Sequence, residues 1–179
     1  MQIWEGLVIK IHHWRITKYN PANRDKNDIY QKNEWTSIGD VGNKFGDNEF
    51  TFEEYFFYEN SYIDAIIRIM CENNIETLKI DTLEKYEYIN YNDFVESESK
   101  KYFKFLKKDI LITKEEVIQI AKFALREIVW CKLASEKMFI HFGYDYYMYI
   151  GSAKPSEEVL KIIKNNGLFV ESMISPYIT

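Results

Sequence analysis

The sequence has few of the residues that break or cross-link a chain. Its 179 residues include 7 glycines, 3 prolines, 2 cysteines and 3 histidines. So few glycines and prolines exclude collagen, low-complexity repeats and long flexible linkers. The two cysteines lack Cys-x-x-Cys spacing, which argues against a disulfide framework and favours a reducing compartment. The adjacent His12 and His13 point to opposite faces of a strand, so we predict no metal site there.

The sequence also shows neither a membrane-spanning segment nor a secretory signal. No apolar run approaches the roughly 20 residues that a membrane span needs. Residues 1–6 (MQIWEG) lack the basic start and long apolar stretch of a secretory signal. These absences predict a cytoplasmic protein without a membrane partner.

The composition is that of a folded protein with an uneven charge layout. Hydrophobic residues make up 46% of the chain and charged residues 28%, which suits one domain over residues 1–179. The net charge is −5, but residues 47–98 hold 14 acidic and 3 basic side chains, and residues 99–137 hold 10 basic and 5 acidic ones. A concentrated acidic segment favours a basic protein partner, and direct binding of nucleic acid is not expected.

Three helices are indicated by their start signals. Thr51 and Glu54 form a predicted capping box that opens a helix ending at Asn73 or Asn74. A second capping box at residues 113–116 (TKEE) opens a helix that we predict to end near residue 134. Residues 155–158 (PSEE) open a third helix, which Gly167 ends.

Strands are predicted from alternating and β-branched patterns between these helices. We assign them to residues 3–18, 34–38, 77–80, 138–142, 146–150 and 168–171, with a turn over 143–145 that closes a hairpin. Residues 100–108 fit either a helical turn or an amphipathic strand. The predicted fold is α+β, a mostly antiparallel sheet with about three helices packed on it.

One set of residues could support nucleophilic chemistry. Cys131, His141 and Asp145 lie within fifteen positions, and this trio of residue types occurs in hydrolases and transferases. We predict Cys131 on a helix and His141 on the next strand, with no glycine-rich oxyanion turn, so a buried thiol is the simpler interpretation. The sequence Gly-x-x-Gly at residues 39–42 lacks the Lys-Ser/Thr of a phosphate loop. No enzyme activity, metal or cofactor is therefore predicted.

The basic segment offers a second alternative, a nucleic-acid adaptor. Between Lys100 and Lys108, the aromatic residues Tyr102, Phe103 and Phe105 are interleaved with lysines, so aromatics could stack on bases while lysines meet phosphates. The competing interpretation is an amphipathic element that buries its aromatics and leaves its lysines in water.

Several stretches together resemble a known group of proteins. They are residues 35–42 (WTSIGDVG), 51–55 (TFEEY) with Glu59 and Tyr62, 130–133 (WCKL), 141–149 (HFGYDYYMY) and 167–171 (GLFVE). The series resembles small bacterial immunity proteins encoded beside polymorphic or contact-dependent growth inhibition toxins. The resemblance implies a cytoplasmic protein that is not an enzyme and that binds and neutralises the C-terminal domain of one cognate toxin, often a nuclease.

The acidic segment supplies the residues that we expect to contact such a basic partner. Complementary charge and a few aromatic anchors would carry the binding. The predicted partner-binding residues are Glu53, Glu59, Asp64, Glu72, Glu84, Tyr86, Glu87 and Tyr88.

Overall fold

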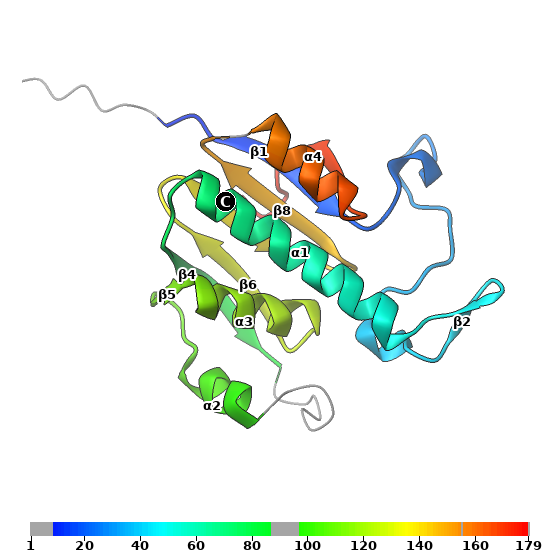
Figure 1. Ribbon diagram of the computed structural model, residues 1–179, viewed down its shortest axis with the longest axis horizontal. Coiled ribbons are helices and arrows are strands. Elements are labelled where there is room, and N and C mark those ends of the chain that lie inside the picture. Colours follow the sequence, from blue (N-terminus) through cyan, green and yellow to red (C-terminus); the bar gives the residue numbers. More distant parts are fainter. Residues whose placement is uncertain (1–8, 87–96, 155, 179) are drawn as a thin grey trace, which may run out of the picture.

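A single large sheet organises the structure. The structure is a computed structural model that describes residues 9–86, 97–154 and 156–178 (Figure 1). The sheet has seven strands in the order β5-β4-β6-β7-β8-β1-β9, and every neighbouring pair is antiparallel. Its strands are β1 (His12–Thr17), β4 (Thr77–Lys85), β5 (Leu111–Thr113), β6 (Val129–Ala134), β7 (Met138–Phe142), β8 (Tyr147–Ser152) and β9 (Phe169–Ser172).

Helices cover one face of this sheet. Three of them, α1, α3 and α4, lie side by side on that face, with α1 running diagonally across it (Figure 1). The predicted α+β fold with an antiparallel sheet is confirmed, with four helices described instead of three. They are α1 (Phe52–Glu72), α2 (Ser97–Phe105), α3 (Lys114–Leu125) and α4 (Glu157–Asn165); short 3-10 helices span Pro21–Asn23 and Ile38–Asp40, and β2 (Lys44–Phe45) and β3 (Asn48–Glu49) form a small hairpin.

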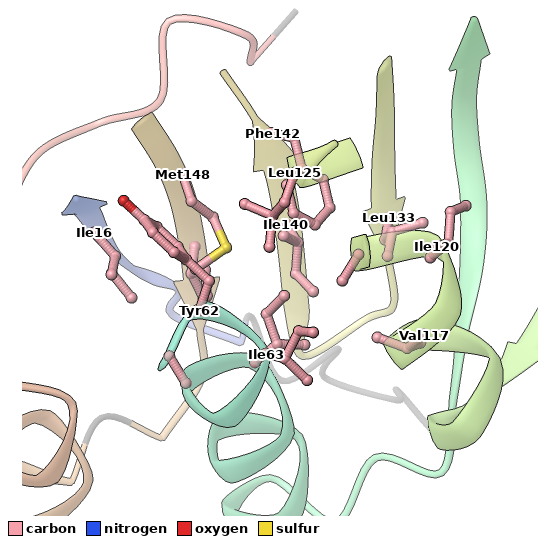
Figure 2. Packing of buried hydrophobic residues seen from close by; sticks show 14 of the residues in the cluster. Ile16, Tyr62, Ile63, Val117, Ile120, Leu125, Leu133, Ile140, Phe142 and Met148 are labelled. Atoms are coloured by element: carbon pink, nitrogen blue, oxygen red, sulfur yellow. The ribbon is translucent and has the colours of Figure 1, made fainter. Parts of the chain in front are cut away.

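The hydrophobic core lies between the helices and the sheet. Figure 2 shows side chains of α1 and α3 pointing toward the strands that they cover. Fully buried residues on both sides fill this layer, which is the main source of stability in a fold of this kind. They include Tyr62, Ile66, Val117, Ile120, Leu133, Ile140 and Met148.

The three predicted helix starts are confirmed, at Thr51, Thr113 and Ser156, but the capping box predicted at Thr51 and Glu54 is not complete. The Thr113 hydroxyl and the Glu116 carboxylate each accept a hydrogen bond from the other's backbone N–H, so this capping box is complete. At α1 the Thr51 hydroxyl accepts from the Glu54 N–H at 3.2 Å. The Glu54 carboxylate instead accepts from the indole N–H of Trp35 at 3.1 Å, which fixes the preceding loop to the helix.

The predicted continuation of the α3 helix to residue 134 is wrong. The helix ends at Leu125, and Glu127 takes a left-handed φ of 58° that turns the chain into β6. From that point the buried side chains recur at every second residue, at Val129, Cys131 and Leu133, as a strand with one buried face requires. Cys131 therefore lies on a strand.

The predicted strand over residues 34–38 is also wrong. The hydroxyl of Ser37 caps the 3-10 helix Ile38–Asp40, and the Asp40 carboxylate accepts from the backbone N–H groups of Thr36 and Ser37 at 2.8 and 3.1 Å. These side-chain bonds favour a turn over a strand. Trp35 is buried there and stacks on Phe50, with ring centroids 4.3 Å apart.

The loop after β1 and the segment after β9 are both held to the sheet by basic side chains. Arg15 of β1 and Arg24 of the following loop both bind the Glu171 carboxylate of β9, at 3.1 and 2.7 Å. Near the C-terminus, the Lys132 ammonium donates to the Tyr177 carbonyl at 2.7 Å. Within the described ranges, no helix is both long enough and apolar enough to cross a bilayer.

Candidate partner-binding site

A cavity opens at the end of the molecule where α3 stops and β6 begins. It measures about 310 Å³ and is also lined by the turn between β7 and β8 and by Tyr86, which follows β4. Two carboxylates, those of Glu127 and Asp145, belong to its lining. Aromatic side chains make up much of the rest: Tyr62, Tyr86, Trp130, Phe142, Tyr144, Tyr146 and Tyr147.

The β7–β8 turn that borders the cavity is conformationally unusual. The Tyr144 carbonyl accepts from the Tyr147 N–H at 3.1 Å, and the two central residues, Asp145 and Tyr146, have φ of 52° and 61°. Two positive φ angles define a type I′ turn, whose second central position normally holds glycine. A tyrosine there is strained. Burial of the Tyr146 ring and a 2.7 Å hydrogen bond from its hydroxyl to the Leu125 carbonyl offset that strain.

Glu127 is a third residue with a left-handed φ that lines the cavity. Its side chain is exposed, and the Ser37 hydroxyl donates to its Oε2 at 3.0 Å. Partial desolvation by neighbouring atoms is the main cause that raises the pKa of Glu127, and the negative charges of Asp145 and Asp40 raise it further, against the Ser37 hydrogen bond. The carboxylates of Glu127, Asp145 and Asp40 are therefore near enough to one another to interact electrostatically.

A buried ion pair supports the surface beside the cavity. The Arg126 guanidinium donates to both Glu59 oxygens at 2.6 and 2.7 Å, and the Tyr55 hydroxyl donates to Glu59 at 3.1 Å. Glu59 is only 2% exposed, so its prediction as a surface contact is wrong. A carboxylate this deeply buried is stable because three donors satisfy it. Its role is to hold Arg126, whose guanidinium lies 5.8 Å from the centre of the Phe56 ring.

The first turns of α1 expose Phe52, Phe56 and Phe57, and the first two of these form a stacked pair beside Arg126. Phe52 and Phe56 are 44% and 39% exposed, and their stacked rings have centroids 6.0 Å apart. Glu53, a predicted partner-binding residue, is exposed between them. We call Phe52, Glu53 and Phe56 the α1 patch. Exposed aromatics flanked by charge are typical of protein interfaces.

Two other predicted residues have structural partners. Asp64 forms an ion pair with Arg68 and accepts from the Asn166 side-chain amide at 2.9 Å. Glu72 accepts from the Ser156 N–H at 3.3 Å, at the start of α4. Both carboxylates therefore contribute to packing α4 against α1.

The remaining predicted residues belong to β4 and the segment after it. Glu84 is exposed and lies opposite Trp130 on the neighbouring strand. Tyr86 is half-buried and lines the cavity. Glu87 and Tyr88 lie outside the described residues. Of the predicted set, Tyr86 lines the cavity, Glu84 lies opposite the cavity residue Trp130, and Glu53 belongs to the α1 patch.

The structure separates the residues of the nucleophilic arrangement. Lys132 pairs with His141 across β6 and β7, so the adjacent Cys131 points to the opposite face of the sheet from His141. Cys131 is fully buried, and burial raises the pKa of its thiol. His141 instead contacts the Ser175 hydroxyl at 2.7 Å, and burial is the main cause that lowers its pKa to about 4. The proposed Cys131–His141–Asp145 arrangement is therefore wrong.

The basic segment matches the amphipathic interpretation. Tyr102 and Phe103 of α2 pack against Phe123 of α3, with ring centroids 6.4 and 5.7 Å apart, while Lys104 is exposed. Two of the three aromatics proposed to stack on bases are therefore engaged with the core. Phe105 is the exposed one.

Comparison of the chain with family models, curated proteins and solved structures found no match. The resemblance to immunity proteins therefore rests on the sequence motifs alone.

Sequence reasoning missed Phe52, Phe56 and the cavity. A signal for the first two was present, since two phenylalanines four residues apart share one face of a helix whose buried face is set by Tyr55, Tyr62 and Ile66. The cavity depends on the Asp-Tyr turn and on residues from three separate strands, and nothing in their spacing brings them together.

Proposed function

We propose that this chain is an immunity-type inhibitor that binds and neutralises a basic toxin domain in the cytoplasm, with a nuclease as the expected toxin class. The observation that carries the proposal is the α1 patch. Two exposed, stacked phenylalanines lie there beside Glu53, and the guanidinium 5.8 Å from the Phe56 ring belongs to Arg126, which directly precedes the cavity residue Glu127.

Aromatic anchors and acidic surroundings have different roles in such an interface. Large rings that fill pockets of the partner supply most of the affinity, because a few buried residues dominate binding. The carboxylates steer a basic partner and raise the association rate, an effect that salt weakens. The Glu59–Arg126 pair would keep Phe56 in place while the partner docks.

Inhibition of a nuclease then follows because the inhibitor and the nucleic acid compete for the same basic groups of the nuclease. A nuclease binds its substrate through basic groups that contact phosphates. A carboxylate-rich surface seated on those groups excludes the nucleic acid, so inhibition requires no chemistry on the part of the inhibitor.

The test uses the toxin domain encoded beside the gene for this chain. We expect the two proteins to co-purify, with a Kd that weakens strongly as salt is raised. Phe56→Ala and Glu53→Lys should each weaken binding at least about tenfold, in line with truncation of an interface anchor and reversal of a charge in it. Cells expressing the toxin domain should survive with the wild-type chain and lose protection with these variants.

The matched control is Glu158→Lys, an equal change of charge at an exposed position of α4. It should leave both affinity and protection unchanged. Failure of the wild-type chain to bind or to protect would refute the proposal. Equal weakening by Glu158→Lys would remove the α1 patch as the binding surface.

A further inference from the structure

Aromatic side chains line much of the cavity, and such rings can bind a cation. Trp130, Tyr144 and Tyr147 are among the aromatic side chains that line it. The face of an aromatic ring is electron-rich and attracts cations, and cages of such rings bind quaternary ammonium groups. At about 310 Å³, the cavity is of the size of a small-molecule site.

The charge at the cavity has one sign. Glu127 and Asp145 contribute carboxylates to the lining, and among the described residues no lysine, arginine or histidine lines it. Arg126, the nearest cation along the chain, is bound by both oxygens of Glu59. The negative charge of the two carboxylates is therefore available to a ligand.

The cavity is also built from a strained and fixed backbone. Glu127, Asp145 and Tyr146 all line it with left-handed φ angles. The Tyr62 hydroxyl donates to the Tyr146 carbonyl at 2.5 Å, and the Tyr146 hydroxyl donates to the Leu125 carbonyl. Strained residues that the surrounding structure holds in place are concentrated at binding sites, where they keep a site preformed.

From the aromatic walls, the two carboxylates and the fixed turn, we propose that this cavity binds a compact organic cation, an alkylammonium or guanidinium group. An anion would be repelled by Glu127 and Asp145, and a neutral apolar ligand would desolvate these carboxylates without compensation. The same chemistry has two sources, a free small molecule or a lysine or arginine side chain of a bound protein. The second source rests on the proposed function, and the first does not.

The experiment titrates the whole chain with choline and, separately, with its neutral isostere 3,3-dimethylbutan-1-ol. Binding is followed by the NMR signal of the Trp130 indole N–H, assigned with Trp130→Phe, and by calorimetry. We expect saturable binding of choline at least about tenfold tighter than that of the isostere, because only the cation gains from the rings and carboxylates.

Variants test the two carboxylates. Glu127→Gln and Asp145→Asn should each weaken choline binding at least about fivefold. Both keep the fold for a physical reason: a glutamine oxygen still accepts from Ser37, and asparagine tolerates the left-handed backbone of position 145. Near-ultraviolet circular dichroism checks this. Glu158→Gln on α4 is the control that should bind as the wild type does.

The two sources are separated by comparing agmatine with a capped Gly-Arg-Gly peptide. Tighter binding of the peptide points to a partner's side chain, and tighter binding of agmatine or choline points to a free cation; either result supports the proposal. It is overturned if the wild type shows no saturable shift up to tens of millimolar, if the isostere binds as well as choline, or if both carboxylate variants bind normally. Such an outcome leaves toxin capture by the α1 patch standing, because that is measured without these ligands.

Discussion

Replacement of Glu59 by glutamine should destabilise the protein by about 3 kcal/mol. Glu59 is 2% exposed and accepts three hydrogen bonds, two from Arg126 and one from Tyr55. Removing one partner of a buried ion pair costs about 3–5 kcal/mol, since the other charge remains in a poorly solvated place. Glutamine keeps one acceptor oxygen for Arg126, so we expect the lower end of that range.

The assay is urea unfolding followed by tryptophan fluorescence and far-ultraviolet circular dichroism, with the slope of free energy against urea unchanged. Arg126→Met should be similarly costly. The double variant should cost at least about 1 kcal/mol less than the sum of the two single variants, because it removes both charges together. Glu158→Gln, an exposed carboxylate on α4, should change stability by no more than about 0.5 kcal/mol.

Two results would refute this reasoning. A loss below about 1 kcal/mol in Glu59→Gln would mean that Arg126 is well solvated without its partner. Additive effects in the double variant would mean that the two side chains do not act as a pair.

Three further predictions concern other parts of the sheet and its flanks. A Cβ at Gly151 would lie 2.0 Å from Cε1 of Phe139, so Gly151→Ala should cost about 1–3 kcal/mol in urea unfolding, and adding Phe139→Ala should relieve part of the clash. Burial lowers the pKa of Lys18 to about 8, below its ordinary value, so the unfolded chain holds this proton more tightly. The unfolding free energy should therefore rise with pH, by about 2 kcal/mol more than in Lys18→Met between pH 7 and 9.5. Burial also lowers the pKa of His141 to about 4. As the pH falls below 7, the unfolded chain therefore binds a proton at His141 that the folded chain does not bind. Stability should fall by about 2 kcal/mol between pH 7 and 5, a loss that His141→Gln should not show.

Helix starts were readable from the sequence because their signals are local. Thr51, Thr113 and Ser156 each accept from an N–H three residues ahead, so the signal and the structure occupy the same few positions. The end of α3 was not readable, because a glutamate takes the left-handed position that glycine or asparagine usually marks. Apolar residues alternate along β6 as they do in a strand, but in the sequence they also continue the helical spacing of α3.

The candidate site was less predictable, since it depends on distant partners. Glutamate is usually a surface residue. The burial of Glu59 depends on its ion pair with Arg126, which lies 67 positions further along the chain. The type I′ turn at Asp145 and Tyr146 lacks the glycine that announces such turns. The charge layout of the sequence favoured carboxylates within residues 47–98 as the binding surface, whereas the two carboxylates of the cavity, Glu127 and Asp145, lie outside that segment.

The place of β1 in the sheet has a consequence for the order in which the protein is made. This strand lies between β8 and β9, and its Arg15 binds Glu171, 156 positions further along the chain. The ribosome therefore releases β1 long before β8 and β9 are synthesised. During that time β1, with its apolar residue Ile16, has neither of its neighbouring strands to pair with. The helices and the β6–β7–β8 hairpins can assemble from contacts that are closer in sequence, and insertion of β1 must follow them. We therefore expect β1, the first strand along the described residues, to be among the last to pair with its neighbours.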